Sequence, residues 1–195
     1  NKNINIVSDI SMSKSGSKLE LNAGNSSTAG SIALTGAVTA DTLNMNLVGA
    51  GTVTQTAALT ANNLRVNGEN TAVTLNNTSN TVGVVAAKVA SLDLTTRSGI
   101  DLGSTYGKGL YVSTVEGTSG ITATGDVKLV SRESNIFVEQ NIQTASTSAT
   151  AIRMNAGEAL SPGANSGADS AINPFGPNVV LTTCKIFFFF YKGIS

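Results

Sequence analysis

Short pairs of large apolar residues, separated by one variable residue, recur along most of the chain. Alternation of this kind places both apolar side chains on one side of a strand and the middle residue on the other. The segments between the pairs are rich in Gly, Asn, Ser and Thr, which form turns and corners. The pattern predicts short strands at residues 19–21, 32–34, 43–45, 64–66, 73–75, 92–94, 100–102, 110–112, 127–129, 136–138 and 152–154.

These strands also form an imperfect internal repeat. The segments Leu64–Leu75, Leu92–Leu102 and Val127–Val138 share one layout, in which a second strand begins eight or nine residues after the first, across a polar corner. Paired strands begin at residues 43, 64, 92 and 127, so the successive steps are 21, 28 and 35 residues. Steps of this size, with loops of variable length, are typical of solenoid coils.

The repeat favours a parallel β-helix. One coil with strands this short cannot bury its apolar pairs alone, whereas coils stacked about 4.8 Å apart bury each pair against the next. We expect about seven coils and a rod on the order of 30 Å long. The predicted register gives two inward columns and one outward row: Leu43, Leu64, Leu92 and Val127; Met45, Val66, Leu94 and Leu129; and Asn44, Arg65, Asp93 and Lys128.

An antiparallel sandwich or barrel is the alternative all-β fold. Its strands are joined by hairpins, and Asn67-Gly68 is the sequence that would form such a turn. All three prolines lie after residue 161. A body without proline fits strands whose N–H groups all donate to neighbours. Because the chain lacks a 3.6-residue apolar period, a helical fold is disfavoured.

Charge and composition exclude several classes of function. The 195 residues include 12 basic and 12 acidic side chains, so a net positive surface for nucleic acid or anionic membrane is not expected. Histidine is absent and Cys184 is the only cysteine, which excludes histidine catalysis, thiolate zinc clusters and an internal disulfide. No apolar stretch approaches the roughly 18 residues of a spanning helix, so we expect no membrane insertion of this segment.

Four stretches carry a family resemblance: Gly49–Gly83, Ser91–Gly103, Gly120–Val138 and Thr147–Ala159. They resemble the β-strand repeats of large bacterial exoproteins, namely the filamentous-haemagglutinin-like adhesins of two-partner secretion systems and the passenger domains of autotransporters. The resemblance covers roughly residues 30–160 and rests on pattern and composition. It implies a right-handed parallel β-helix, export across a bacterial envelope, and a role in surface attachment or filament formation.

The composition changes near residue 160, which divides the chain into three parts. We interpret residues 1–160 as a β-helix region of a longer solenoid, beginning at an internal cut or at a processed N-terminus. Residues 161–178 have the composition of a Pro/Gly/Ala-rich loop or linker. Residues 179–195 form an apolar tail with four of the six phenylalanines, either a frame-end artefact or a strand that caps the coils.

Carboxylates are the candidate catalytic groups, because some β-helices cleave polysaccharides. Asp93 and Asp101 occupy equivalent positions on consecutive predicted strands, with Arg97 between them. A glycosidase needs two carboxylates within about 5–10 Å of each other. Consecutive strands of one coil belong to different sheets, so we expect Asp93 and Asp101 to diverge and to be solvated. The same interpretation applies to Glu133 and Glu139, and we expect no catalytic residue.

Other motifs predict neither a cofactor nor a metal. The chain has no GGxGxD calcium loop, and the glycines of residues 103–109 match no nucleotide or phosphate loop. Asn25, Asn76 and Asn77 begin glycosylation sequons, which arise by chance in a sequence this rich in Asn and Thr. We expect Asn76, Asn77 and Asn80 to be corner residues that adopt left-handed backbone and bond to the next coil.

Two functional hypotheses follow. The first is a non-enzymatic structural and adhesive segment of a large secreted bacterial surface protein, acting as a rigid stalk or attachment surface outside the outer membrane. Its expected partners are a glycan or protein on a host or neighbouring cell and, at full length, an outer-membrane secretion partner, but no nucleic acid. The alternative is a glycan-active enzyme or a carbohydrate-binding module on the same β-helix scaffold.

Overall fold

The fold is a stack of parallel β-coils. The computed structural model describes residues 2–102, 108–157, 179–181 and 186–188, which contain strands and turns but no helix. The strands are β1 (Ile4–Ile6), β2 (Ile10–Ser11), β3 (Lys18–Ala23), β4 (Ile32–Leu34), β5 (Val38–Leu47), β6 (Thr52–Gln55), β7 (Leu59–Leu75), β8 (Thr81–Thr96), β9 (Gly109–Val112), β10 (Thr114–Val115), β11 (Thr118–Ser119), β12 (Ile121–Ala123), β13 (Val127–Ser131), β14 (Asn135–Val138), β15 (Ile142–Thr144), β16 (Ile152–Ala156), β17 (Val179–Leu181) and β18 (Ile186–Phe188).

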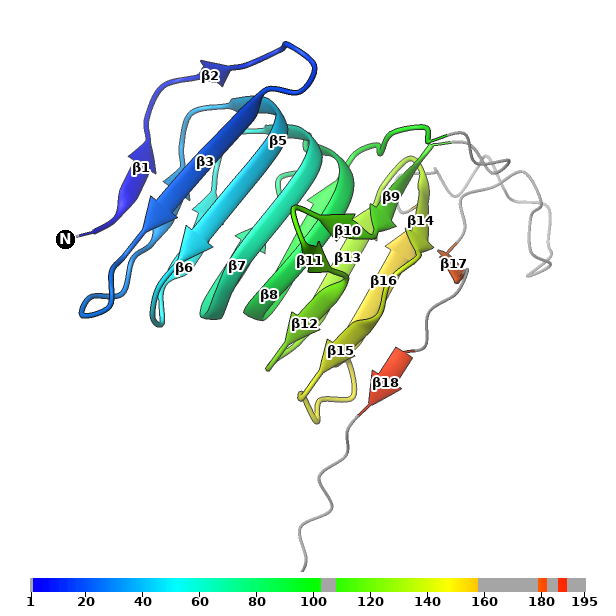
Figure 1. Ribbon diagram of the computed structural model, residues 1–195. Helices are drawn as coiled ribbons and strands as arrows, with labels where there is room; N and C mark the ends of the chain where they lie inside the picture. The colour runs from blue at the N-terminus through cyan, green and yellow to red at the C-terminus, as the bar shows by residue number, and fades with distance from the viewer. Residues whose placement is uncertain (1, 103–107, 158–178, 182–185, 189–195) are drawn as a thin grey trace, which may run out of the picture.

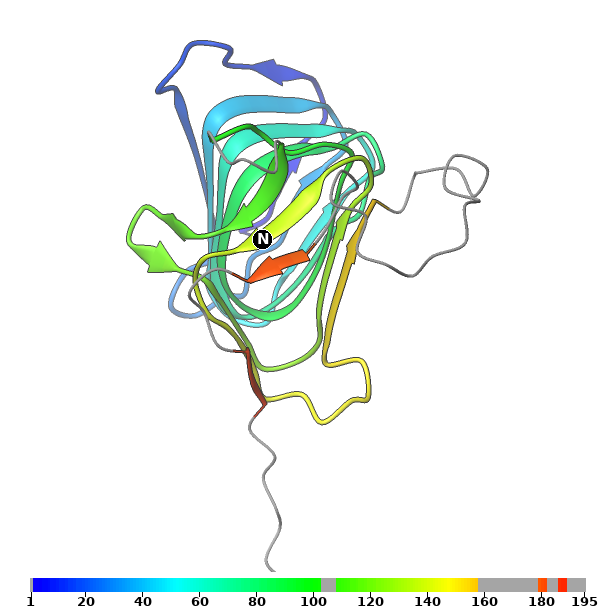
Figure 2. The same cartoon turned by 90° about the vertical axis from the view of Figure 1, so that its right-hand side faces the viewer.

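Each strand pairs in parallel with its counterpart one coil further along, so the strands wind into a right-handed β-solenoid of about six turns (Figure 1). The predicted parallel β-helix is therefore confirmed, with about six coils instead of about seven. Among the described strands, only β10 and β11 pair antiparallel. Viewed from its end, the solenoid encloses a narrow interior, and the β10–β11 hairpin projects from its side (Figure 2).

The coils have three faces. The first face contains β1, β4, β6, the ends of β7 and β8, β13 and β16. The second, narrower face contains β2 and the beginnings of β5, β7 and β8. The third face contains β3, the rest of β5, the middle of β7 and β8, and the remaining parallel strands. Strands β7 and β8 therefore pass through all three faces.

The interior is built from columns of equivalent apolar residues. In such a column, each side chain packs against the same position one coil above and one coil below. On the first face the column is Ile4, Ile32, Val53, Val73, Leu92, Val127 and Ile152. On the third face it is Leu19, Leu43, Leu64, Val85, Val112 and Val138. These columns belong to one continuous hydrophobic core.

The predicted register is correct within residues 43–66 and within residues 92–129, but wrong in placing these two segments in the same columns. Leu43 pairs with Leu64, and Leu92 pairs with Val127, as predicted. However, the first pair lies on the third face and the second pair on the first face, so Leu64 and Leu92 do not share a column. The second predicted column, which joins Met45 and Val66 to Leu94 and Leu129, divides in the same way.

The error arises from a coil that lacks the alternating signature. Leu64 is followed in its column by Val85, which is 21 residues later. The outward neighbours of Val85 are Val84 and Ala86, and both are buried because other parts of the chain cover them. With apolar residues on both sides, this strand shows no apolar–polar alternation. The predicted repeat therefore passed over it and stepped directly from residue 64 to residue 92.

A second, smaller core accounts for these outward apolar residues. Val84 and Ala86 pack with Tyr111, Val115 and Phe137 on the outside of the third face. The rings of Tyr111 and Phe137, on the neighbouring strands β9 and β14, stack with centroids 4.5 Å apart and planes inclined by 17°. Such stacking stabilises aromatic pairs beyond their buried area. This external core fixes the insertion that contains β10 and β11 against the solenoid.

One local prediction is wrong, and the hairpin turn that the alternative antiparallel fold would use is absent. The expected strand at residues 100–102 is absent: Ile100 forms an isolated bridge with Gly109, and Leu102 is 55% exposed. The Asn67-Gly68 segment is no hairpin but continues through β7, pairing in parallel with β8. Gly68 is required there by space, since a Cβ would lie 2.5 Å from the Thr71 hydroxyl.

A buried asparagine joins neighbouring coils at a corner. Asn80 is fully buried, and its amide exchanges two hydrogen bonds with the amide of Gln55. It also accepts a bond from the Leu59 N–H and donates to the carbonyls of Leu75 and Thr95. Every polar atom of the side chain is therefore paired, which a buried amide requires.

The predicted bonding between corners and coils is confirmed for two of the three asparagines. Asn77, like Asn80, reaches a neighbouring coil, donating to the carbonyl of Thr56. Asn76 is exposed. The left-handed backbone predicted for these corners is wrong, because Glu116 is the only described residue other than glycine with positive φ.

The described part of the C-terminal tail extends the sheets. Strand β17 pairs in parallel with β14, and β18 pairs in parallel with β15. The linker predicted at residues 161–178 and Cys184 lie outside the described residues. The interpretation of residues 179–195 as a frame-end artefact or a capping strand stays a prediction.

We expect Leu64→Ala to lower the free energy of unfolding by about 2–5 kcal/mol, because it opens a cavity in a fully buried column. Leu102→Ala is the matched control at an exposed site and should change stability by less than about 0.5 kcal/mol. Urea unfolding followed by circular dichroism measures both. Equal losses in the two variants would contradict the observed register.

Asn80→Ala should destabilise the fold more than Asn77→Ala. The first variant leaves the Leu59 N–H and the Thr95 carbonyl buried without a partner, at about 1–3 kcal/mol for each group. The second removes bonds at a partly exposed corner, where water replaces them.

Asn80→Asp provides a second readout. A carboxyl buried at this site has a raised pKa, because burial disfavours its charged form. The free energy of unfolding of Asn80→Asp therefore falls as the pH rises above about 3.9, which is the pKa of the carboxyl in the unfolded chain. The stability difference between wild type and Asn80→Asp should therefore grow from pH 4 to pH 7. A difference independent of pH would show that residue 80 is not buried.

Candidate functional site

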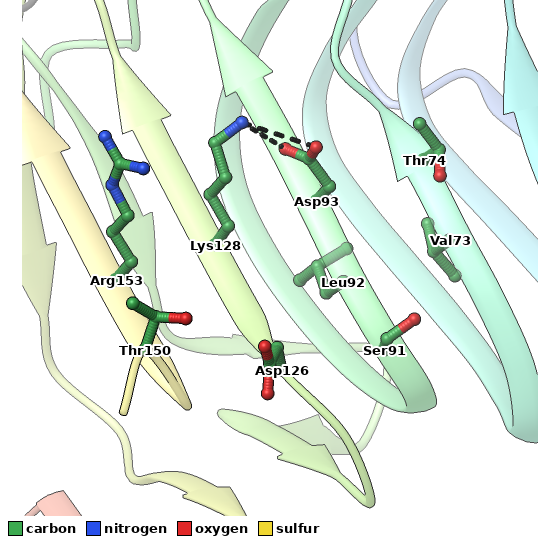
Figure 3. Close-up of a pocket in the computed structure, with 9 residues that line it drawn as sticks. All are labelled: Val73, Thr74, Ser91, Leu92, Asp93, Asp126, Lys128, Thr150 and Arg153. Carbon is green, nitrogen blue, oxygen red and sulfur yellow. Dashed lines mark hydrogen bonds and ion pairs between the residues drawn. The ribbon is translucent and has the colours of Figure 1, made fainter. Parts of the chain in front are cut away.

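A row of polar side chains crosses the outer surface of the first face. Thr74, Asp93, Lys128 and Arg153 lie in register on β7, β8, β13 and β16 (Figure 3). Each is the middle residue of an apolar pair, so its neighbours in sequence point into the core while it points outward. Adjacent members of the row are therefore about 4.8 Å apart along the axis of the solenoid.

The predicted outward row is thus confirmed in part. Lys128 does follow Asp93 on the first face. The other two members of the prediction, Asn44 and Arg65, are neighbours on the third face. On the first face the row also contains Thr74 and Arg153. The predicted row instead continued from Asp93 to Arg65, which lies on the third face.

A groove of about 300 Å³ runs along this row. Its other polar residues are Ser91, which lies in the last third of β8, and Asp126 and Thr150, which lie just before β13 and β16 begin (Figure 3). Val73 and Leu92 complete the lining. We call this hollow, defined by the row and these five residues, the first-face groove. Its volume is at the lower end of the range for small-ligand sites.

The charged groups of the first-face groove are not equally satisfied. The Lys128 ammonium lies 3.2 Å from Oδ1 of Asp93, and both side chains are about one-third exposed. Asp126 accepts a hydrogen bond from the Ser146 hydroxyl. Arg153 has no acidic partner in the described part of the chain, and its guanidinium reaches only the side-chain oxygen of Asn155, at 3.2 Å. Among the residues that the structure describes, Arg153 is therefore the cation of the groove that has no acidic partner, and its guanidinium can bind an anion.

The candidate catalytic pair does not form. Asp93 lies in the first-face groove, whereas Asp101 lines a separate hollow of about 540 Å³ together with Asp41 and Asn62. The two carboxylates therefore diverge, as expected from the sequence. In the second hollow, Asp41 accepts hydrogen bonds from the Asn62 amide and from the backbone N–H of Gly16.

The other charged candidates are surface groups. Glu133 is exposed and bonds to Arg97, with 2.9 Å between Nε and Oε1. Glu139 is half-buried. Among the residues that the structure describes, no three acidic, histidine or cysteine side chains gather as a metal site would require. No helix in that part of the chain has the length and apolarity needed to cross a membrane.

The outer surface of the third face is covered by the β10–β11 hairpin. Glu116 and Gly117 form its two-residue turn, both with positive φ, as in a type I′ hairpin. The hairpin lies back over the preceding coils: the Lys18 ammonium is 2.8 Å from the Glu116 carboxylate, and Arg65 donates to the Thr118 hydroxyl over 2.8 Å. The hairpin therefore covers part of the third face, and the larger hollow, lined by Val84 and by Thr114 of the hairpin, lies beside it.

Comparisons with known proteins add no assignment, since no family model, no curated protein and no solved structure matches the chain.

The ion pair between β3 and the hairpin predicts a specific titration. The hydrogen bond from Lys18 and then its charge hold the pKa of Glu116 below the ordinary value. We expect Lys18→Met to raise the pKa of Glu116 towards that value, as measured by NMR titration of the carboxyl carbons. In the wild type, the stabilisation from this ion pair is complete above the pKa that Glu116 has in the unfolded chain. It is lost as the pH falls through the lower pKa that Glu116 has in the folded chain.

Glu69 provides the matched control. Lys88 holds the pKa of this exposed carboxylate down in the same way. Lys88→Met should therefore raise the pKa of Glu69 and leave Glu116 unchanged, while Lys18→Met does the reverse. If Lys18→Met leaves the titration of Glu116 unchanged, the hairpin does not lie over β3 in solution.

Proposed function

We propose that this chain is a structural and adhesive segment of a large secreted bacterial surface protein, acting as a rigid stalk that presents polar faces to another cell. The observation that carries the proposal is the continuous parallel stack, in which a single core runs through successive coils. The resemblance of the repeats to bacterial exoprotein repeats supports the same function.

The stack supports a mechanical role. Strands β5, β7 and β8 are each bonded along their length to the coils on both sides. Bending the rod at one point would break many backbone hydrogen bonds and open the column of apolar residues there. Nearest-neighbour coupling of this kind makes repeat proteins cooperative. A rod with these properties holds a binding surface at a fixed distance from its point of attachment.

The surface supports an adhesive role. Its outward positions are largely Thr, Ser and Asn, which donate and accept hydrogen bonds without strong charge. The net charge of zero provides no broad electrostatic attraction for nucleic acid. A glycan or protein on a host or neighbouring cell is the partner that such a surface suits. At full length, an outer-membrane secretion partner would export the chain.

A carbohydrate-binding module is the second candidate, and the first-face groove favours it. Enzymatic cleavage is less well supported, because Asp93 is held by Lys128 and Asp126 by Ser146. A general acid needs a carboxyl that keeps its proton near neutral pH, in an apolar or acidic environment. The groove instead presents carboxylates that already accept bonds from a cation and a hydroxyl.

Adhesion assays test the proposal. Beads coated with the chain should attach to epithelial or bacterial cells at least tenfold more often than beads coated with serum albumin. Excess soluble chain should compete, because it occupies the same receptors. Attachment no better than that of albumin beads, across both cell types, would overturn the adhesive function.

Hydrogen exchange tests the stalk separately. Amides of β5, β7, β8 and β13 should exchange at similarly slow rates, because they belong to one cooperative stack. A fast-exchanging coil in the middle of the stack would divide the rod and contradict a rigid stalk.

A further inference from the structure

We propose that the first-face groove binds a carboxylate-bearing sugar unit of an acidic glycan, with Arg153 as the residue that receives the carboxylate. The inference rests on the proposed adhesive function and names the chemistry of its receptor. It is carried by the arrangement of the row Thr74, Asp93, Lys128 and Arg153 on four adjacent strands.

The charge of the groove that has no opposite partner among the described residues is a guanidinium. Lys128 is paired with Asp93, and Asp126 accepts a bond from Ser146, whereas the exposed Arg153 has no carboxylate partner among the described residues. Arginine presents a planar fork of donors that matches a carboxylate with two parallel hydrogen bonds. A ligand carboxylate bound at Arg153 would therefore give this arginine an acidic partner, as Asp93 is the acidic partner of Lys128.

The remaining groups suit sugar hydroxyls. The exposed Asp126 retains a carboxylate oxygen that can accept a bond from a ring hydroxyl, whereas Asp93 offers only its Oδ2, because its Oδ1 is buried. Ser91, Thr74 and Thr150 contribute hydroxyls that can both donate and accept. A few positioned polar groups in a shallow hollow fix the orientation of a small ligand.

The dimensions fit a short piece of glycan. Asp93 and Arg153 are two strands apart on the first face, which corresponds to about 9.6 Å along the axis. This distance spans a disaccharide, so one sugar could place its carboxylate at Arg153 while the next places hydroxyls at Asp93. The groove volume of about 300 Å³ agrees with one or two sugar units.

The charge balance excludes a dense polyanion as the preferred ligand. Asp93 and Asp126 cancel Lys128 and Arg153, so the groove has no net charge. A heavily sulfated glycan or a nucleic acid would gain one contact at Arg153 and be repelled by the two carboxylates. A glycan with one carboxylate per repeat meets no such repulsion.

We expect a single groove to bind its glycan with low affinity. None of its lining residues is aromatic, so no ring stacks on the sugar. Affinity would come from hydrogen bonds that replace bonds to water, each with a modest net gain. Many copies of the chain on one surface would raise the overall attachment by multivalency.

Binding of defined sugars to the full chain tests the inference. The acidic probes are trigalacturonic acid and 3′-sialyllactose, which carry the carboxylate on different sugars. Their neutral counterparts are cellotriose and lactose, and heparin is the polyanion. NMR titration of the backbone amides of β8, β13 and β16 reports both the affinity and the site.

We expect at least one acidic probe to bind at least fivefold more tightly than its neutral counterpart and to shift the amides of β13 and β16. Binding of trigalacturonic acid alone would identify a uronate, and binding of sialyllactose alone a sialic acid, and either result supports the inference. Equal binding of acidic and neutral sugars, preferential binding of heparin, or no binding of either acidic probe would overturn it.

Two arginine variants complete the test. Arg153→Gln should weaken the acidic probe at least tenfold and leave the neutral sugar unchanged. Arg97→Gln is the matched control, because Arg97 is also exposed but pairs with Glu133 and does not line the groove. Urea unfolding of both variants checks that the fold is intact. Unchanged affinity in Arg153→Gln would overturn the assignment of the carboxylate site.

The two proposals fail in different ways. If wild-type beads attach to cells but the acidic sugars do not bind, the adhesive function stands and the groove is not its glycan site. If the beads do not attach, the adhesive function fails whatever the sugars do.

Discussion

In-register stacking of identical positions is the constraint on which this structure depends. A pair of apolar residues on a strand of three to five residues is too small to exclude water by itself. It becomes buried only because the coil above and the coil below place an equivalent pair in the same column. Backbone hydrogen bonds between parallel strands fix the coils at a constant spacing, and the asparagine and glutamine amides at residues 80 and 55 fix their corners. Core, register and rod shape therefore have one cause.

The same constraint organises the surface. Because side chains alternate between the two sides of a strand, aligning the inward residues also aligns the outward ones. The row from Thr74 to Arg153 is the consequence: four residues widely separated in sequence become neighbours without any specific loop to bring them together. A functional surface on such a scaffold is a ladder with one residue from each coil.

Much of the fold was predictable because alternation is a local signal. The apolar pairs at residues 43–45, 64–66, 92–94 and 127–129 all lie in strands, and the parallel stack follows from their repetition. What failed was the assignment of strands to faces, which joined residues 64–66 of the third face to residues 92–94 of the first. Val84 and Ala86 are apolar on the outer side because the second core covers them, and that contact depends on Tyr111 and Phe137 much later in the chain. No local pattern reveals a contact of this kind, so the third-face strand segment at residues 84–86 was not recognised.

The groove was predictable to the same extent. The pairing of Asp93 with Lys128 followed from two adjacent coils that were aligned correctly, whereas placing Thr74 required pairing the strand at residues 73–75 with the strand at residues 92–94. Asp126 and Thr150 come from the turns that lead into β13 and β16, where no period constrains the side-chain direction. The hairpin was missed for a related reason, since its Glu116-Gly117 turn is a weaker signal than Asn67-Gly68, which space inside the coil requires instead.

The two faces differ in how far other parts of the described chain cover their outer surfaces. On the third face, the hairpin adds a second core and an ion pair between Lys18 and Glu116, residues 98 positions apart, which ties early coils to late ones. That face gains contacts and loses open surface, and even the outward Asn44 is only 2% exposed. On the first face, no described residue covers the row in this way, and the inward column is complete beneath it. Substitutions in the row can therefore change the chemistry of this surface while leaving the column that holds the coils together unchanged.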